Sequence, residues 1–429
     1  SRQWLKEKTA TMRGTRPGDP VADMLFNMAF KLVVTDARHR INLSSDLQWF
    51  GSPKPSDDVT SGAPIPDKGF AEITFVDDIA YAIHSTSADS VLSSLQTVAS
   101  CLHDAAAARG LVINYQAGKT EAIIKLAGHG SKRTKHKVWH ENFGRLPVLT
   151  EHGCQYLRLV HSYKHLGSFV QDHAVIQMDL RYRNAQARKA YGQLSRPFYC
   201  KRNVSDATKI PVFSALVMSR HAYNVHTWAW ATKGDIEQWQ NGIRNQVAAL
   251  ARNRVRPIPP FQFTTAELCA LVGVHSPEDM LHASRLRYVK RAIQVAPKCL
   301  WSLLYQNTHA NSWISHFQDS CNWLWEHAPG ARPQLFEDAT KALSFIALDV
   351  KWLGRVRPAL NSCLQFRAAH AEGKLWTLRM QHQLSKYDEI PKFHVTQKDQ
   401  VWKCGLCDDS FETKKALAVH ARHKHQYKT

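Results

Sequence analysis

Residues 71–85 read AEITFVDDIAYAIHS, and this stretch decides how the first half of the chain is expected to fold. Apolar side chains recur at every second position on both sides of the adjacent acids Asp77 and Asp78. Such alternation is typical of strands, and polar residues between two alternating runs indicate a tight turn. The stretch therefore predicts a β-hairpin that carries two carboxylates at its tip.

Two interpretations of this pair of acids are open. Asp is a common turn residue because its carboxylate hydrogen-bonds to nearby backbone amides. Alternatively, adjacent carboxylates repel each other unless a divalent cation lies between them, and Mg²⁺ is normally held by one or two carboxylates together with substrate phosphates. The surrounding sequence has to distinguish a plain turn from a magnesium site.

The residues after the hairpin predict a helix followed by two strands. Apolar residues at three- and four-residue steps, a cap at Ser87 and a stop at Gly110 are typical of an amphipathic helix. The run LVINYQAGKTEAIIKLAG (111–128) indicates a strand, a turn at Ala117–Thr120 and a second strand. Strands that flank a helix covering one face form a split β-α-β arrangement. The basic stretch GHGSKRTKHK (128–137) is expected to be a loop.

Composition limits the class of protein. The 429 residues suffice for two to four domains, and the formal charge of +20, from 56 basic and 36 acidic residues, favours a nucleic-acid partner. Nine scattered cysteines do not form a disulfide framework and suit a reducing compartment. No run approaches the roughly 20 apolar residues of a spanning helix, and no signal peptide is recognisable. We therefore expect an intracellular protein, nuclear or cytoplasmic, with no membrane partner.

From about residue 172 onward the pattern becomes helical. The segments MDLRYRNAQARKAYGQL (178–194) and LHASRLRYVKRAIQ (281–294) are basic amphipathic helices. Their charges are either simply solvated or track a nucleic-acid backbone. PGARPQ (329–334) is expected to be a linker, and DEIPKFHVTQ (388–397) leads to a separate C-terminal module.

Four blocks of sequence occur in a defined order: GTRPGDPVADMLFN (14–27), FVDD (75–78), GLVINYQAGKTE (110–121) and SYKHLGSFV (162–170). In this order they resemble the reverse transcriptases of non-LTR (LINE-type) retrotransposons. The later helical segment (188–228) is similar to the thumb of that family. The resemblance covers roughly residues 10–255.

The resemblance implies an RNA-directed DNA polymerase, a nucleotidyltransferase that binds an RNA template and a DNA primer and uses deoxynucleotides. It implies an α+β fold in which a partial polymerase palm, a split β-α-β sheet with the catalytic hairpin, spans 1–170. A helical thumb-like region would follow over 171–255. Residues 256–395 are expected to be helical and basic, with no role that the sequence identifies.

The resemblance also assigns roles to residues. Asp77 and Asp78 would hold catalytic Mg²⁺ between the primer oxygen and the nucleotide phosphate. Lys119 matches a lysine that protonates the departing pyrophosphate, although a solvated turn lysine explains it equally well. Nucleic-acid or nucleotide contacts fall on Gly14, Arg16, Gly18, Tyr163, Leu166 and Gly167. For the last three, ordinary hairpin packing is the alternative.

Two departures from the family pattern affect the expected activity. The third catalytic Asp of the family lies several tens of residues before the first block, and 13 residues precede Gly14 here. Pro17 stands where the family usually has Gln, and Ala22 and Asp23 stand where it has Ser-Pro. We therefore expect a partial polymerase that lacks the fingers subdomain and does not polymerise alone.

A second motif lies at residues 404–425, CGLCDDSFETKKALAVHARHKH. Its spacing fits C-x₂-C-x₁₂-H-x₄-H, the pattern of a C₂H₂ zinc finger. Two thiolates on a hairpin and two imidazoles on one helix face would complete a structural, tetrahedral Zn²⁺ site with the ligands Cys404, Cys407, His420 and His425. His423 follows His420 too closely to be the expected ligand. Residues 400–427 therefore predict a ββα zinc finger, with Phe411 and Leu417 in its small core.

The finger lacks the side chains of a sequence reader. In the family, helix positions −1, 3 and 6 read bases, and these positions are Thr413, Ala416 and Val419. None makes the bidentate contacts by which Arg reads guanine or Asn reads adenine. Basic residues that could meet phosphates are Lys414, Lys415, Arg422 and Lys424. We expect a general nucleic-acid clamp or a protein contact.

Two functions follow from these observations. The first is the palm and thumb part of a retroelement reverse transcriptase with a C-terminal nucleic-acid-binding finger. The alternative is a non-enzymatic zinc-finger nucleic-acid-binding remnant of such an element. An Asp on an apolar strand upstream of Ser1 would favour the enzyme, and a start codon close to Ser1 would favour the remnant.

Overall fold

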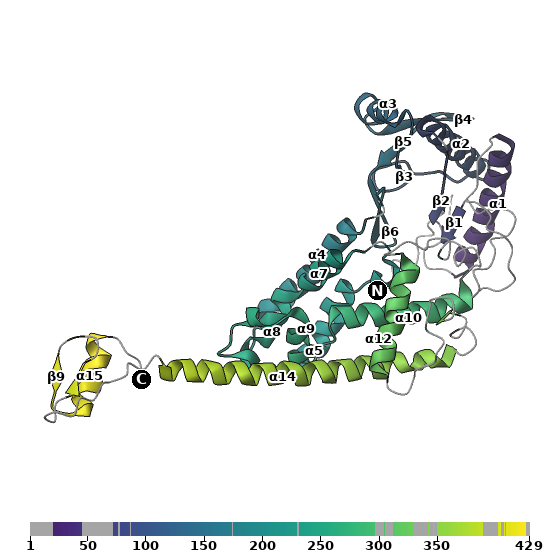
Figure 1. The fold of residues 1–429 in the computed structure, drawn as a ribbon. Helices are drawn as coiled ribbons and strands as arrows, with labels where there is room; N and C mark the ends of the chain where they lie inside the picture. The colour runs from purple at the N-terminus through teal and green to yellow at the C-terminus, as the bar shows by residue number, and fades with distance from the viewer. Residues whose placement is uncertain are drawn as a thin grey trace, which may run out of the picture. The chain divides into compact units, whose positions relative to one another are not determined.

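The computed structural model describes residues 20–44, 72–75, 78–85, 87–173, 175–229, 231–296, 304, 312–328, 342–343, 346, 350–388, 402–404, 407 and 409–425. It has two compact units, one of residues 1–243 and 275–363 and the other of 244–274 and 364–429 (Figure 1). Both helices and small sheets are present, so the expected α+β class is confirmed. The finer division into palm, thumb and helical region remains a prediction.

The first unit begins with two packed helices and a hairpin. Helix α1 (Pro20–Ser44) lies beside α2 (Ala88–Ala107), and their shared core is formed by Val33, Ala37, Ala105 and Ala106 (Figure 1). Strands β1 (Glu72–Phe75) and β2 (Asp78–Tyr81) pair antiparallel. The expected hairpin is therefore present.

The N-terminus of α2 follows the sequence signals. The Ser87 hydroxyl accepts a hydrogen bond from the Ser90 amide at 3.2 Å, which satisfies one of the free amides of the first turn. Gly110 takes a left-handed φ of 72° shortly after the helix ends, as its lack of a side chain permits. The predicted helix and its cap are confirmed.

A three-stranded sheet lies next to α2. Strands β3 (Glu121–Ile123), β5 (Gly153–Val160) and β4 (Arg145–Thr150) are ordered β3-β5-β4, with β3 parallel and β4 antiparallel to β5. Their inward side chains form a core with α2 that contains Val148, Leu157 and Leu159. Because β4 is at the edge of this sheet, its outer backbone groups need other partners.

Polar side chains of α2 supply those partners. Three side chains one turn apart bond successive alternate backbone groups of β4 or the turn after it: Gln96 donates to the Pro147 carbonyl at 2.8 Å, Ser100 donates to the Leu149 carbonyl, and Asp104 accepts from the Glu151 amide at 3.0 Å. This set of three bonds, which we call the α2–β4 ladder, covers the outer edge of the sheet with one face of a helix.

Two local expectations were wrong. Residues 111–115 keep the side-chain alternation of a strand, with Val112 and Asn114 exposed, but pair with no strand among the described residues. Alternation reports one buried face and says nothing of a neighbouring strand. The basic stretch expected to be a loop forms α3 (Ser131–His136) and a π-helical turn (Lys137–Glu141). The buried Thr134 fixes α3 by donating to Asp89 at 2.8 Å.

The second hairpin of the unit consists of β6 (Ser162–His165) and β7 (Ser168–Gln171), which pair antiparallel. From there the first unit is helical, as expected. The helices among the described residues are α4 (Gln177–Leu194) with a π-helical turn (Ser195–Tyr199), α5 (Asp206–Phe213) with a π-helical turn (Ser214–Met218), α6 (Ser219–His221), a 3₁₀ turn (Val225–Thr227), α7 (Lys233–Asn241), α10 (Pro277–Val295), α12 (Trp313–His327), a 3₁₀ stretch (Val350–Arg355) and the start of α14 (Val356–Asp388).

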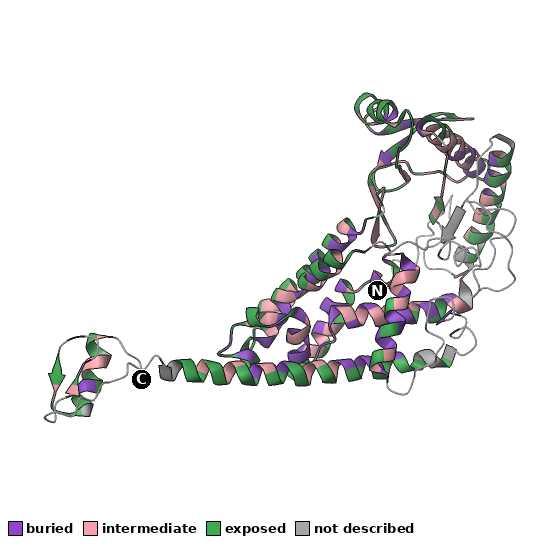
Figure 2. Ribbon diagram, viewed as in Figure 1, coloured by how far each residue is buried: buried purple, intermediate pink, exposed green. Residues whose placement is uncertain are grey.

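The largest core of the first unit lies between α10, α12 and the start of α14. Its buried residues include Leu286, Phe317, Leu324 and Leu360, and Figure 2 shows α12 mostly buried or half-buried. Arg285 of α10 is also buried, and it donates to the His316 carbonyl at 2.9 Å. Apolar contacts therefore dominate this core, with a few polar side chains bonded inside it.

The two predicted basic helices are present as α4 and α10, but not all of their charges face solvent. Arg183 of α4 is buried and forms an ion pair with Asp179 at 3.0 Å. Arg285 of α10 is also buried. Arg181 and Arg287 on the same two helices are exposed. A surface that tracks a nucleic-acid backbone therefore uses only part of the basic residues that the sequence pattern suggested.

The second unit contains α8 (Arg244–Val255), a 3₁₀ turn (Pro260–Gln262), α9 (Thr265–Val272) and the rest of α14. Glu267 completes a capping box with Thr264 and accepts from Lys374 of α14 at 2.8 Å. The unit ends with β8 (Trp402–Lys403), β9 (Ser410–Phe411) and α15 (Lys414–Lys424). Among the described residues, none of the helices combines the length and apolar character needed to cross a bilayer.

Candidate functional site

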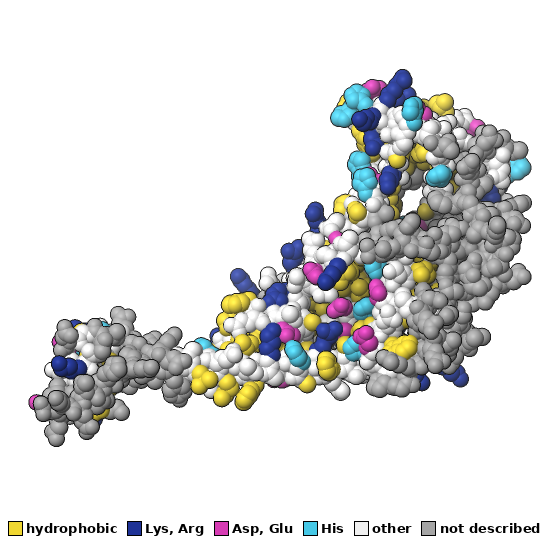
Figure 3. Space-filling model, viewed as in Figure 1, with side chains coloured by type: hydrophobic (Ala, Val, Ile, Leu, Met, Phe, Trp, Pro, Cys, Tyr) yellow, Lys and Arg dark blue, Asp and Glu magenta, His cyan; other side chains and the backbone are white. Residues whose placement is uncertain are grey.

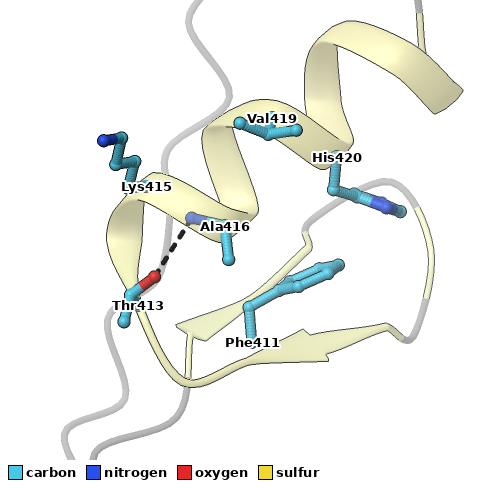
Figure 4. Close-up of a pocket in the computed structure, with 6 residues that line it drawn as sticks. All are labelled: Phe411, Thr413, Lys415, Ala416, Val419 and His420. Carbon is cyan, nitrogen blue, oxygen red and sulfur yellow. Dashed lines mark hydrogen bonds between the residues drawn. The ribbon is translucent and has the colours of Figure 1, made fainter.

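The C-terminal module has the secondary structure that its sequence predicts. Strands β8 and β9 pair antiparallel, with Trp402 opposite Phe411, and Thr413 caps α15 by accepting from the Ala416 amide at 3.1 Å. Figure 4 shows the Phe411 ring facing the helix, and Leu417 is buried. The hairpin and the helix are thereby held against each other around a very small apolar core.

Four side chains converge between the hairpin and the helix. The ligand atoms of Cys404, Cys407, His420 and His425 all lie within 4.8 Å of one another. Cys404 Sγ is 3.5 Å from His425 Nε2, and Cys407 Sγ is 3.2 Å from His420 Nε2. Zinc bonds of usual length in a tetrahedron place sulfur and nitrogen about 3.5 Å apart. The separations therefore fit a tetrahedral ion held by two thiolates and two imidazoles.

His423 lies outside this group, although it is one turn of helix from His420, and its side chain is exposed. His425 follows the last turn of α15, where its amide donates to the Ala421 carbonyl at 3.2 Å. From that position its imidazole reaches Cys404. This arrangement is the one expected from the spacing of the motif.

An acid beside the cluster was not singled out in the sequence. The Asp409 carboxylate accepts from Lys424 Nζ at 2.7 Å and lies 3.8 Å from His420 Nδ1, on the ring edge opposite Nε2. The hydrogen bond from Lys424 holds the pKa of Asp409 below its usual range. Metal-binding imidazoles commonly face a carboxylate on their second nitrogen, which orients the ring. In the sequence, the only sign of this contact is that an acid stands two residues after the second cysteine of the motif.

One side of the finger, where α15 meets β9, is apolar and open. Phe411, Thr413, Lys415, Ala416, Val419 and His420 line a shallow hollow, which is drawn in Figure 4. It includes all three base-reading positions of the family pattern, and Val419 is 49% exposed. Short apolar side chains offer no directed hydrogen bonds to a base edge. Of the four basic residues expected to meet phosphates, Lys415 is exposed and Lys424 is engaged with Asp409.

The expected catalytic hairpin is described only in part. Asp78 is the first residue of β2, pairs with Phe75 across the turn and is exposed. Asp77 lies outside the described residues, as do Gly14, Arg16 and Gly18 of the first block. Of the two carboxylates expected at the hairpin tip, the structure therefore describes only that of Asp78.

Lys119 and Tyr163 lie together, although 44 residues separate them in the chain. The Tyr163 hydroxyl donates to the Lys119 backbone carbonyl at 2.8 Å. Burial, the charge of Asp78 and the charge of Glu121 together raise the pKa of Tyr163. Of the positions that the polymerase resemblance selects, Tyr163 therefore contacts the Lys119 backbone and lies within the electrostatic reach of Asp78. The Lys119 contact uses its backbone, so it gives the ammonium group no role.

Leu166 and Gly167 form the tight turn of the β6–β7 hairpin. Their φ angles are 46° and 80°, the two left-handed residues of a hairpin turn. The turn is tied to other elements, because Tyr223, in the turn after α6, donates to the Leu166 carbonyl at 3.2 Å and Arg183 of α4 donates to the Gly167 carbonyl. Leu166 itself is 47% exposed. The hairpin therefore presents an apolar side chain from a rigidly anchored turn.

No family model, no curated protein and no solved structure matches this chain.

Proposed function

We propose that this protein binds zinc through its C-terminal finger and binds nucleic acid through phosphate contacts. The observation that carries the proposal is the convergence of four ligand atoms, from Cys404, Cys407, His420 and His425, within 4.8 Å. Two sulfurs and two imidazole nitrogens favour Zn²⁺ over the harder cations that prefer oxygen ligands. Zinc would be structural, because all four positions belong to the protein.

The charge distribution supports nucleic acid as the partner. The chain carries a net charge of +20, and Figure 3 shows Lys, Arg and His side chains gathered over the end of the first unit that contains α3. Lys132, Arg133 and Lys135 on α3 are exposed. Phosphate contacts of this kind give affinity without sequence information. The apolar hollow where α15 meets β9 likewise favours binding that ignores base sequence.

The metal assignment is tested with the full chain. After chelation, Co²⁺ is added in place of Zn²⁺ and its d–d absorption reports tetrahedral thiolate and imidazole ligation. We expect His425→Ala to lose the tetrahedral spectrum and most of the affinity, and His423→Ala, the matched control, to retain both. The reverse result would show that His423, and not His425, is the ligand. An unchanged spectrum in Cys404→Ser would show that the proposed site does not bind the metal.

The same variants test the nucleic-acid part of the proposal. His425→Ala should weaken binding of a fluorescent single-stranded oligonucleotide, because metal ligation is what folds so short a module. His423→Ala should not. If the two variants bind the oligonucleotide as the parent protein does while the Co²⁺ spectra differ, the finger binds zinc but not nucleic acid.

A second candidate is the polymerase interpretation, in which this chain is the palm and thumb part of a retroelement reverse transcriptase. It is favoured by one observation, the position of Tyr163, which donates to the Lys119 carbonyl and whose pKa is raised in part by the charge of Asp78. Asp77 and Asp78 would then bind Mg²⁺, with deoxynucleotides, an RNA template and a DNA primer as substrates. The non-enzymatic remnant is the alternative within this interpretation.

Primer extension distinguishes these two. The chain should bind a primer–template but extend it little with Mg²⁺, because Pro17 offers no amide donor where the family has a Gln that places template and nucleotide. Robust extension that disappears in Asp77→Ala and Asp78→Ala would establish the enzyme and show that this Gln is dispensable.

A further inference from the structure

A cavity in the first unit is separate from both sites described above. It has a volume of about 270 Å³ and lies where the start of α10 meets the start of α14. Its polar lining consists of His275, Ser284, Arg287, Arg357 and Asn361, and Leu360 belongs to its apolar part. These side chains are drawn from two segments far apart in the chain, so the fold brings them together.

The cavity concentrates positive charge without a balancing acid. Arg287 and Arg357 are exposed, and neither forms a hydrogen bond or an ion pair with any residue that the structure describes. Acidic residues are absent from the described lining. The nearby Asp279 is buried, where it accepts from Ser276 at 2.6 Å and from Trp323 at 3.1 Å. Two guanidinium groups that face one cavity repel each other unless an anion lies between them.

His275 adds a further unsatisfied group. Its Nδ1 atom is buried and has no hydrogen-bond partner among the described residues. Burial lowers the pKa of His275; the charge of Asp279 opposes this shift and that of Arg287 adds to it. The imidazole is therefore neutral at pH 7 and can donate one N–H. A buried polar atom without a partner is uncommon and calls for a ligand or a water.

We propose that this cavity binds a phosphate group, with the guanidinium groups of Arg287 and Arg357 as its main ligands. Guanidinium groups form paired, charge-assisted hydrogen bonds to phosphate oxygens. Ser284, Asn361 and His275 supply further donors around the same space. Together the donors exceed the roughly four acceptor positions of a carboxylate, which favours a phosphate.

The size of the cavity limits the ligand. Its volume lies just below the roughly 300–1,000 Å³ of sites that enclose a drug-sized molecule. One phosphate with a small attached group fits, and a whole nucleoside triphosphate does not. The phosphate therefore belongs either to the backbone of a bound nucleic acid or to a small phosphate ester, and both present the same chemistry to the arginines.

The first test is a titration of the full chain with inorganic phosphate, followed by its thermal unfolding midpoint with chloride holding ionic strength constant. Phosphate should raise the midpoint. Arg287→Gln and Arg357→Gln should each weaken phosphate binding about tenfold or more, as expected for loss of a charge-assisted hydrogen bond. Arg291→Gln is the matched control, because Arg291 is exposed on α10 but does not line the cavity.

Arg287→Lys separates geometry from charge, and it should bind phosphate with intermediate strength because a lysine cannot form the paired bonds. Equal phosphate responses in the parent, Arg287→Gln, Arg357→Gln and Arg291→Gln would overturn the proposal, as would the absence of any response in the parent.

The second test identifies the source of the phosphate. If the cavity holds a backbone phosphate, Arg287→Gln weakens binding of a single-stranded oligonucleotide, lowers its salt dependence, and inorganic phosphate competes with it. If the cavity holds a small ester, oligonucleotide binding is the same in Arg287→Gln as in Arg291→Gln, while the response to inorganic phosphate differs. Both outcomes require that the phosphate response depend on Arg287.

Discussion

At the scale of single residues, Gly242 lies against the side chain of Asn184 with no room for a Cβ atom. A Cβ atom at Gly242, which follows α7, would overlap the side-chain amide of Asn184 on α4. Asn184 is buried, and its Oδ1 has no hydrogen-bond partner among the described residues. The helical backbone of Gly242 would itself accept an alanine, so the constraint comes from its neighbour alone.

Gly242→Ala should therefore destabilise the protein by about 1–3 kcal/mol, the usual cost of an overpacked core. Urea denaturation measures the change. The double variant Gly242→Ala with Asn184→Ala should recover most of the loss, because the smaller side chain clears the space. If Gly242→Ala costs the same free energy in both backgrounds, the contact between these two residues does not limit this site.

His221 is a second residue with a measurable consequence. It is fully buried, its ring stacks on Trp239 at 4.7 Å, and neither of its ring nitrogens has a hydrogen-bond partner among the described residues. Burial lowers its pKa to about 3. Between pH 3 and 6.5 the unfolded chain therefore binds a proton at this residue that the folded chain does not, so stability falls as the pH falls.

His221→Phe should flatten this part of the pH dependence. Because of His221, the free energy of unfolding at pH 5 should be about 2 kcal/mol lower than at pH 7. This follows from a loss of about 1.4 kcal/mol for each pH unit below 6.5. Urea denaturation at pH 5 and pH 7 gives the difference, and exposed His152→Phe serves as the control. An unchanged difference in His221→Phe would mean that the imidazole is protonated in the folded protein.

At the scale of elements, the α2–β4 ladder explains how the open side of an edge strand is stabilised. Each of its bonds joins a side chain of α2 to the backbone, so the strand sequence itself is not read. A neutral hydrogen bond of this kind contributes about 1 kcal/mol, and removing the donor leaves a carbonyl that must find water.

Gln96→Ala and Ser100→Ala should each lower the free energy of unfolding by about 1 kcal/mol. Ser93→Ala, on the exposed side of the same helix, should change it by much less. Urea denaturation compares the three. A decrease in Ser93→Ala as large as in the other two would assign the effect to helix propensity instead of the ladder.

Elements also mark the limit of prediction from the sequence. The hairpin at 72–81, the helix capped by Ser87 and the finger helix capped by Thr413 carry local signals, namely alternation, periodicity and capping residues, so the sequence identified them. The partner of a strand and the helical form of 131–136 depend on contacts from elsewhere, such as Asp89 with Thr134, which no local pattern encodes.

The candidate sites divide in the same way. The four candidate metal ligands share one short segment, so their spacing alone predicted the group that the fold brings together. The cavity of Arg287 and Arg357 joins segments distant in the chain, and no spacing rule could have found it. Asp409 lies between these cases, since it is near the cysteines but gains meaning only from its contacts with Lys424 and His420.

At the scale of the whole molecule, the excess of positive charge should determine how the protein binds nucleic acid. The logarithm of the binding constant should fall steeply with the logarithm of salt concentration, by about 0.9 for each duplex phosphate contacted. Homopolymer and mixed sequences should bind with similar affinity if, as proposed, the exposed basic residues contact phosphates. Fluorescence anisotropy across a salt series measures both.

The contribution of α3 to this slope is separable. Replacing Lys132, Arg133 and Lys135 by Gln should reduce the slope by about one for each phosphate that is no longer neutralised, while leaving the Co²⁺ spectrum of the finger unchanged. A flat salt dependence in the parent protein, or a strong preference for one short sequence, would contradict binding through phosphates.

The α2–β4 ladder has one more consequence, which comes from the different rise per residue of a helix and a strand. Four residues of helix advance about 6.0 Å, whereas two residues of antiparallel strand advance about 6.8 Å. The side chains of the helix and the backbone groups of the strand therefore move out of step by about 0.8 Å with each successive bond. Only a few such bonds can form in a row, and here three do. A slip of β4 by one residue would turn its outward groups toward β5 and break all three bonds together. Helix α2 thus fixes the register of β4 against β5 and also prevents another chain from pairing with the open edge of the sheet.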